Sequence, residues 1–162
     1  MARKEEDRED LMREATALVR RVELRLPGDS QTCLVGFRRG GEASVFVGTD
    51  PVFQFNAAGE LRRGFWNGRL VKAEGSRLVY LERRRTETEV QLVRQKFTAA
   101  QTTEFLQLAM ETLNRLRRAL HHGDLDILQQ VPLELDVVAE LTAWLDSVAD
   151  PLAIASIPNV HS

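Results

Sequence analysis

The sequence predicts a single α+β domain in which an antiparallel β-meander lies between an N-terminal helix and two main C-terminal helices. Residues 32–97 are a series of short apolar runs separated by tight-turn signals, which is typical of consecutive hairpins. The segments on both sides repeat apolar residues at spacings of three and four, as amphipathic helices do. A chain of 162 residues is also long enough to bury a core without disulfides or metals.

These patterns divide the chain into four segments. We assign an N-terminal helix and connector to residues 1–31, the meander to 32–97, a helical part to 98–150 and a short apolar tail to 151–162. We expect the tail to pack on the domain, because most of its residues are apolar.

Three features favour a cytoplasmic protein without a membrane partner. The N-terminal residues lack the apolar core of a secretory signal. No apolar run approaches the roughly 20 residues that a membrane span requires. Cys33 is the only cysteine, so no internal disulfide forms, which favours a reducing compartment.

Residues 5–21 are predicted to form the first helix, because apolar side chains from Leu11 onward recur along one stripe. From Val22 to Leu26 the apolar residues alternate like a strand, although their spacing also continues the helical stripe. We interpret 22–26 as a short strand that ends at Pro27-Gly28, with a helix as the alternative.

The meander is expected to contain six or seven strands. Gly40-Gly41, Asn67-Gly68 and Gly75-Ser76 indicate two-residue hairpin loops, and Asp50-Pro51 indicates another turn. The last run fits a strand or the start of a helix, and we interpret it as a strand. The runs that these turns delimit are 32–39, 42–48, 52–55, 60–66, 69–74, 77–84 and 89–97.

Asn67-Gly68 is the strongest hairpin signal, and it fixes a register for its two strands. A two-residue loop there places Trp66 opposite Arg69 and Arg63 opposite Lys72. A second loop at Gly75-Ser76 extends the register to the next strand. One face then carries Trp66, Val71, Ala73, Leu78 and Tyr80, with Gly64 among them leaving space that an aromatic ring would fill.

The opposite face of these strands is also largely apolar. An antiparallel sheet with one wet face alternates cleanly between apolar and polar residues, and this one does not. We therefore expect helices on one face and a folded-back sheet or a second subunit on the other. The residues of the second face are Leu61, Phe65, Leu70, Val79 and Leu81, interrupted by Arg63 and Lys72.

At Thr98 the apolar period becomes that of a helix. Thr98 and Gln101 resemble a capping box, and we expect a long helix to about His121 with Gly123 as its stop. Asp124 is expected to cap a short helical turn that contains Leu125, Ile127 and Leu128. The final helix is predicted to begin near Pro132 and to end before Pro151, with an apolar stripe made of Leu135, Val138, Leu141, Leu145 and Val148.

Charge is segregated along the chain, although its net charge is only −2. Residues 59–96 hold ten lysine or arginine residues and five acidic ones, whereas 97–162 hold three and nine. The basic and acidic segments either neutralise each other by packing together or face partners.

The strongest candidate site is the pair formed by Arg63 and Lys72. Like charges directly opposite each other destabilise a sheet, so a phosphate or carboxylate bound between them would relieve a real cost. The alternative is that Glu74 screens the pair, or that the two long side chains lie over neighbouring apolar residues. The rim of the anion site would be formed by Arg62, Arg69 and Arg77.

Two further binding chemistries have weaker support. Arginines of the run 83–85 would suit phosphates, but the chain lacks a recognised nucleic-acid motif and is acidic overall. His121 and His122 are adjacent on a helix and point about 100° apart, so we predict no metal site. The rings that would stack on bases are those of Phe53, Phe55, Trp66 and Tyr80.

The leading hypothesis is a non-enzymatic binding or adaptor domain without a cofactor. It would self-associate as a homo-oligomer through a sheet face or a long helix, and its basic hairpin would receive an anionic ligand or an acidic protein segment. A nucleic-acid-binding sheet is one alternative. The other is an enzyme of unrecognised type acting on an anionic substrate, with catalytic carboxylates drawn from Glu42, Asp50 and Glu60 near strand ends, although no catalytic motif occurs.

Overall fold

The computed structural model describes residues 3–16, 20–26, 32–38, 41–48, 50–75, 77–123, 125–133 and 136–148. Helix α1 (Arg3–Thr16) is followed by eight strands, helix α2 (Ala99–His122), strand β9 (Asp126–Val131) and helix α3 (Val137–Ser147). The eight strands are β1 (Arg20–Arg25), β2 (Thr32–Phe37), β3 (Ala43–Val47), β4 (Val52–Phe55), β5 (Leu61–Trp66), β6 (Arg69–Glu74), β7 (Arg77–Arg85) and β8 (Val90–Lys96).

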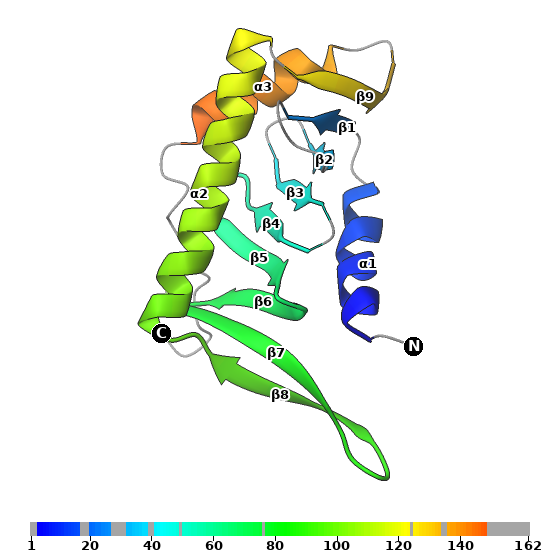
Figure 1. The fold of residues 1–162 in the computed structure, drawn as a ribbon, viewed down its shortest axis with the longest axis vertical. Coiled ribbons are helices and arrows are strands. Elements are labelled where there is room, and N and C mark those ends of the chain that lie inside the picture. The colour runs from blue at the N-terminus through cyan, green and yellow to red at the C-terminus, as the bar shows by residue number, and fades with distance from the viewer. Residues whose placement is uncertain are drawn as a thin grey trace.

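The nine strands of the described residues form one antiparallel sheet in the order β8-β7-β6-β5-β4-β3-β2-β1-β9 (Figure 1). The α+β prediction is confirmed. The meander predicted for 32–97 is present as β2 to β8. The strand interpretation of 22–26 and of 89–97 is also correct, since β1 and β8 occupy these segments.

Helices α2 and α3 cover one face of the sheet, and α1 lies on the other (Figure 1). A helix of 24 residues is about 36 Å long, and strands lie about 4.8 Å apart, so α2 alone can cross about seven strands. The main core accordingly extends from β1 to β7. Its helical residues include Phe105, Ala109, Leu113, Leu116, Leu141 and Leu145.

The register predicted from Asn67-Gly68 and Gly75-Ser76 is confirmed. Arg63 pairs with Lys72 and Trp66 with Arg69, and Glu74 pairs with Arg77 in the next hairpin. Asn67 and Gly68 have φ values of 52° and 74°, as a type I′ turn requires. The two-residue loop predicted at Gly40-Gly41 was wrong, because Phe37 pairs with Ala43 and the Arg38 N–H donates to the Glu42 carbonyl.

The sequence did not reveal the hydrogen bonds that connect Asp50 to the Asn67-Gly68 turn. The Asp50 carboxylate accepts hydrogen bonds from the backbone N–H of Asn67 at 2.8 Å and of Gly68 at 3.3 Å. The β3–β4 loop therefore holds the hairpin turn in place.

Gly64 lies beneath an aromatic ring, as predicted. The ring belongs to Phe105 of α2, and a Cβ on Gly64 would lie 2.9 Å from the Phe105 Cζ and 2.3 Å from the Val52 carbonyl oxygen. Phe105 also packs against Phe53 and Trp66, with ring centroids 5.2 and 5.5 Å away. The close approach of α2 to β5 depends on the missing side chain.

The second sheet face is covered by α1, and the expectation of a folded-back sheet there was wrong. Leu11 of α1 is buried against Phe46, Val52 and Phe65. The Arg8 guanidinium anchors the helix by donating to the Gly48 carbonyl at 2.8 Å. The N-terminal helix thus supplies the cover that the apolar second face requires.

Leu61 was assigned to the wrong face. It pairs with Phe55 and packs in the core beneath α2 and α3, whereas the sequence placed it beside Phe65. The register between β4 and β5 shifts between Gln54 and Phe55, so the period of two does not continue through β5.

Two predictions about helices were wrong. The first helix ends at Thr16 rather than near residue 21, because the chain enters β1 at Arg20. The short helical turn predicted around Ile127 is instead strand β9, which pairs antiparallel with β1. The open edge of β1 offers this segment backbone partners that its sequence does not reveal.

The ends of the C-terminal helices are defined by capping residues. The capping box of Thr98 and Gln101 is present, and Gly123 ends α2 with a φ of 65°, as predicted. Helix α3 begins after Asp136, whose carboxylate accepts from the Ala139 N–H at 3.0 Å, and not at Pro132. The predictions for Asp124, Leu135 and the tail 151–162 concern residues outside those described.

Cys33 is expected to be unreactive in the folded protein. Burial raises the pKa of its thiol to about 12, against a weaker opposing effect of Arg115, so almost no nucleophilic thiolate exists at pH 8. We expect no reaction with a chromogenic disulfide reagent at pH 8 and one reacting thiol per chain in denaturant. Rapid labelling without denaturant would contradict the buried position.

Candidate anion-binding pocket

A polar pocket of about 420 Å³ lies between α1 and strands β3 to β5. We call it the arginine pocket, because it holds two of the arginines predicted from the sequence, Arg62 and Arg63, together with Arg38. Its lining residues are Glu14, Arg38, Glu42, Ser44, Gln54, Arg62 and Arg63.

The floor of the arginine pocket is a row of paired residues on three adjacent strands. Ser44 pairs with Gln54, and Gln54 pairs with Arg63. The Gln54 amide donates to the Ser44 hydroxyl at 3.2 Å and accepts from Arg63 Nε at 2.7 Å. Ser44 and Gln54 are buried, and this chain of hydrogen bonds satisfies them and holds the Arg63 guanidinium in place.

Arg63 has an acidic partner within the chain. Its Nη2 donates to the carboxylate of Glu14 on α1. Lys72, opposite Arg63, is exposed and forms no ion pair with a carboxylate of the described residues. Glu74, expected to screen the pair, forms an ion pair with Arg94 instead. The repulsion predicted between Arg63 and Lys72 is therefore offset by α1.

Arg38 and Arg62 are the open donors of the pocket. The Glu42 carboxylate lies 3.8 Å from the first and 3.7 Å from the second, both too far for a direct hydrogen bond. Within the part of the chain that the structure describes, neither guanidinium donates a hydrogen bond. Their side chains are 57% and 45% exposed, so both groups can be reached from solvent.

The charges of the arginine pocket do not balance. Three guanidinium groups face two carboxylates, which leaves a formal charge of +1. An anion that enters would restore neutrality, and planar guanidinium groups match carboxylate and phosphate oxygens in bidentate geometry. The pocket is therefore chemically suited to one anionic group.

Two other predicted site residues lie elsewhere. Arg69 is on the opposite sheet face, where its guanidinium lies 4.6 Å from the centroid of the Tyr80 ring. Arg77 is exposed on β7 and lines none of the pockets described here. The pocket thus contains Arg62 and Arg63, whereas Lys72 pairs with Arg63 without lining the pocket, and Arg69 and Arg77 lie away from it.

Arg38 was missed as a site residue. It follows β2, next to the Gly40-Gly41 loop, and no pattern in its own segment sets it apart from other surface arginines. The row from Ser44 through Gln54 to Arg63 could not be predicted either. A two-residue loop at Asp50-Pro51 would place Gln54 opposite Val47 instead of Ser44, and the shift near Gln54 changes the register with β5.

The aromatic rings considered for nucleic acid lie on the sheet face covered by α2 and α3. Phe53 and Phe55 are buried. Trp66 packs edge-on against Phe97 at 5.9 Å, and Tyr80 packs against the same ring at 5.6 Å. None of these rings is available as an open platform for stacking bases.

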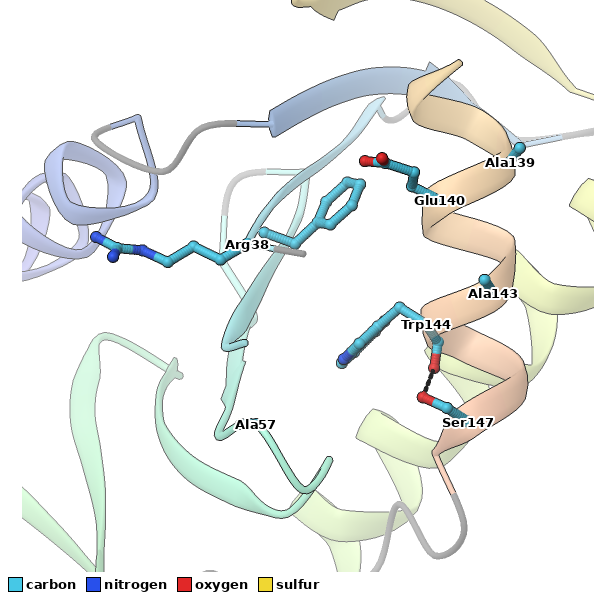
Figure 2. A pocket seen from close by; sticks show the side chains of 8 residues that line it. Arg38, Ala57, Ala139, Glu140, Ala143, Trp144 and Ser147 are labelled. Carbon is cyan, nitrogen blue, oxygen red and sulfur yellow. Dashed lines mark hydrogen bonds between the residues drawn. The ribbon is translucent and has the colours of Figure 1, made fainter. Parts of the chain in front are cut away.

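A second pocket, of about 480 Å³, separates α3 from the end of β2 and the β4–β5 loop (Figure 2). The polar side chains that α3 contributes have partners within the chain. The Ser147 hydroxyl donates to the Trp144 carbonyl at 2.7 Å, and Glu140 forms an ion pair with Arg20. The Arg38 side chain points away from α3 (Figure 2). With no open polar group to orient a ligand, this pocket is the weaker candidate.

The three carboxylates considered for catalysis have separate partners. Glu42 faces Arg38 and Arg62, Asp50 accepts from the hairpin turn, and Glu60 accepts from the Asn56 amide at 3.1 Å. They do not form the shared cleft that paired acid–base chemistry needs.

The described residues offer no candidate metal centre and no membrane-spanning helix. These residues contain no group of three or more histidine, cysteine or acidic side chains placed to hold a metal ion. His121 instead contacts the Asp146 carboxylate at 2.9 Å. No helix in the described ranges is long and apolar enough to cross a membrane.

Comparison of the chain with protein-family models, with curated proteins and with solved structures gave no match.

Proposed function

We propose that the chain is a non-enzymatic binding domain whose arginine pocket receives an anionic group, the carboxylate or phosphate of a ligand or of an acidic protein segment. The observation that carries this proposal is the pair of open guanidinium groups of Arg38 and Arg62, which lack direct hydrogen bonds beside a pocket of net positive charge. Glu42 is a built-in competitor that an incoming anion would displace.

The contact distances support displacement of Glu42. Charge-assisted hydrogen bonds form at about 2.7–2.9 Å, so Glu42 at 3.7 and 3.8 Å gains only part of the available attraction. A free anion can approach both guanidinium groups directly. Arg63 is already held by Gln54 and Glu14, and it contributes charge from the floor of the pocket.

Removing Arg62 is expected to weaken anion binding about tenfold or more, because a hydrogen bond to a charged group contributes about 1.5–3 kcal/mol. Isothermal titration calorimetry of Arg62→Ala with inorganic phosphate, citrate and a glutamate-rich peptide measures this loss. Glu42→Gln should change affinity in the opposite direction, since it removes the competitor. Binding should also weaken as salt rises.

Arg77→Ala is the matched control, because it removes the same charge from another strand of the same sheet, outside the arginine pocket. It should leave affinity nearly unchanged. Equal losses in Arg62→Ala and Arg77→Ala would show a diffuse charge effect and contradict a defined site. Absence of binding by all three probes would also contradict the proposal. An oligonucleotide that binds while the three probes do not would favour the nucleic-acid alternative.

The self-association predicted from the sequence is still a prediction. Both faces of the central strands are occupied by the chain's own helices, α2 with α3 on one side and α1 on the other. We therefore do not expect a homo-oligomer to form through a sheet face over β2 to β6.

A further inference from the structure

Strand β9 concentrates the exposed apolar surface of the described residues. The large hydrophobic side chains most open to solvent are Ile127, Leu128 and Leu133, at 41%, 45% and 80% exposure. The first two belong to β9, and Leu133 follows it directly. The two core clusters are buried beneath the three helices, whereas these side chains of β9 are exposed.

β9 is also an edge strand. It pairs with β1 on one side, and it ends the order of the sheet on the other (Figure 1). A row of backbone N–H and C=O groups along a sheet edge is a template for pairing with another strand. An exposed apolar edge is therefore an interaction surface.

The two edges of the sheet differ in how they are protected. Edge strand β8 carries Arg94 and Lys96, and such charges discourage pairing with further strands. Edge strand β9, Asp-Ile-Leu-Gln-Gln-Val, carries a single charge, at Asp126. Charged side chains therefore protect the β8 edge, whereas the β9 edge has only the bulge at Leu128, where the register with β1 shifts.

We propose that β9 is a homodimer interface, at which two copies of the chain pair β9 to β9 in antiparallel orientation and join their sheets into one. The proposal does not depend on the arginine pocket. A two-fold axis near the middle of β9 uses the same surface on both copies and closes the assembly at two. Apolar side chains of β9 would then leave water together.

The charges favour a second copy as the occupant of this edge. Antiparallel pairing about the middle of β9 places the two Asp126 carboxylates at opposite ends of the shared edge, so no like charges meet. A strand with one charge in six residues offers little to attract a strongly basic or acidic partner. Antiparallel pairing of β8 with β8 about its middle would instead bring the two Arg94 side chains close together, which is unfavourable.

Leu128 gives a test that leaves the fold undisturbed. It is skipped in the register between β1 and β9, where Gln129 pairs with Glu23 and Ile127 with Leu24. Leu128→Lys should therefore keep the β1–β9 ladder but place like charges at the shared edge. We expect light scattering coupled to size-exclusion chromatography to show a concentration-dependent dimer for the wild type. The dissociation constant should rise at least about tenfold for Leu128→Lys.

Gln91→Lys on β8 is the matched control, since it adds the same charge to the other edge and should leave the dimer intact. A wild type that stays monomeric at high concentration would overturn the proposal. So would a dimer that survives Leu128→Lys but not Gln91→Lys. Growth beyond two copies would indicate β8-to-β9 pairing in an open chain, and would also overturn it.

A cysteine variant tests the geometry without weakening the edge. Leu128→Cys should form an intermolecular disulfide under mild oxidation, because the proposed axis brings the two copies of residue 128 together. Gln91→Cys should not form one efficiently. The native Cys33 is buried and does not interfere. Equal cross-linking of the two variants would contradict the proposed interface.

Discussion

Replacing Phe105 with alanine is expected to lower the free energy of unfolding by about 3–5 kcal/mol. Phe105 is fully buried at the point where α2 crosses β5, and its ring packs against those of Phe53, Trp66 and Phe97. Deleting the ring leaves a cavity bounded by other aromatic rings and by the backbone at Gly64, which has no side chain to fill it. Urea denaturation followed by tryptophan fluorescence measures the loss.

Phe105→Leu distinguishes the free-energy cost of the cavity from the cost of losing the aromatic contacts. Leucine keeps much of the apolar volume, so its cost should be clearly smaller than that of alanine. A loss below about 1 kcal/mol for Phe105→Ala would mean that the site collapses around the deletion or that α2 is not anchored there. An unchanged denaturant slope is expected for both variants, because the surface exposed on unfolding barely changes.

The parts of the fold that local chemistry determines could be predicted from the sequence. Asn67-Gly68 and Gly75-Ser76 restrict the loop to two residues, and the loop length then determines which residues oppose each other. The capping box at Thr98 and the glycine at 123 fix the ends of α2 in the same way. Each signal lies within a few residues of the structure that it specifies.

The parts that depend on distant segments could not be predicted. Ile127 and Leu128 resemble a helical turn by spacing, and only the open edge of β1, about a hundred residues earlier in the sequence, makes them a strand. The cover of the second face by α1 is equally non-local. The irregularity near Gln54 moved Leu61 to the other face, because a period of two carries no information about bulges.

The candidate site was predicted in part for the same reasons. Arg63 opposite Lys72 followed from the hairpin register, but the acidic partner of Arg63 came from α1, 49 residues away along the chain. Arg69 could have been excluded from the sequence alone. It opposes Trp66, and the register already placed Trp66 and Arg63 on opposite faces.

Gly64→Ala is expected to destabilise the protein by about 3 kcal/mol, a large cost for one methyl group. The added Cβ would lie 2.3 Å from the Val52 carbonyl oxygen, a backbone atom of the neighbouring strand that cannot rotate away. It would also press on the end of the Phe105 ring, at 2.9 Å. The melting temperature, followed by circular dichroism, should fall by about 6–12 °C.

Gly123→Ala is the matched control, because it isolates the other cost that a glycine substitution can carry. Gly123 has a φ of 65°, and a Cβ there meets nothing within 4 Å, so only left-handed strain of about 1–2 kcal/mol opposes the change. At Gly64, by contrast, the substitution destabilises the protein because the added Cβ overlaps closely packed atoms. If Gly64→Ala cost no more than Gly123→Ala, β4, β5 and α2 would have to move apart without penalty. That result would contradict the tight stacking of Phe105 on the sheet.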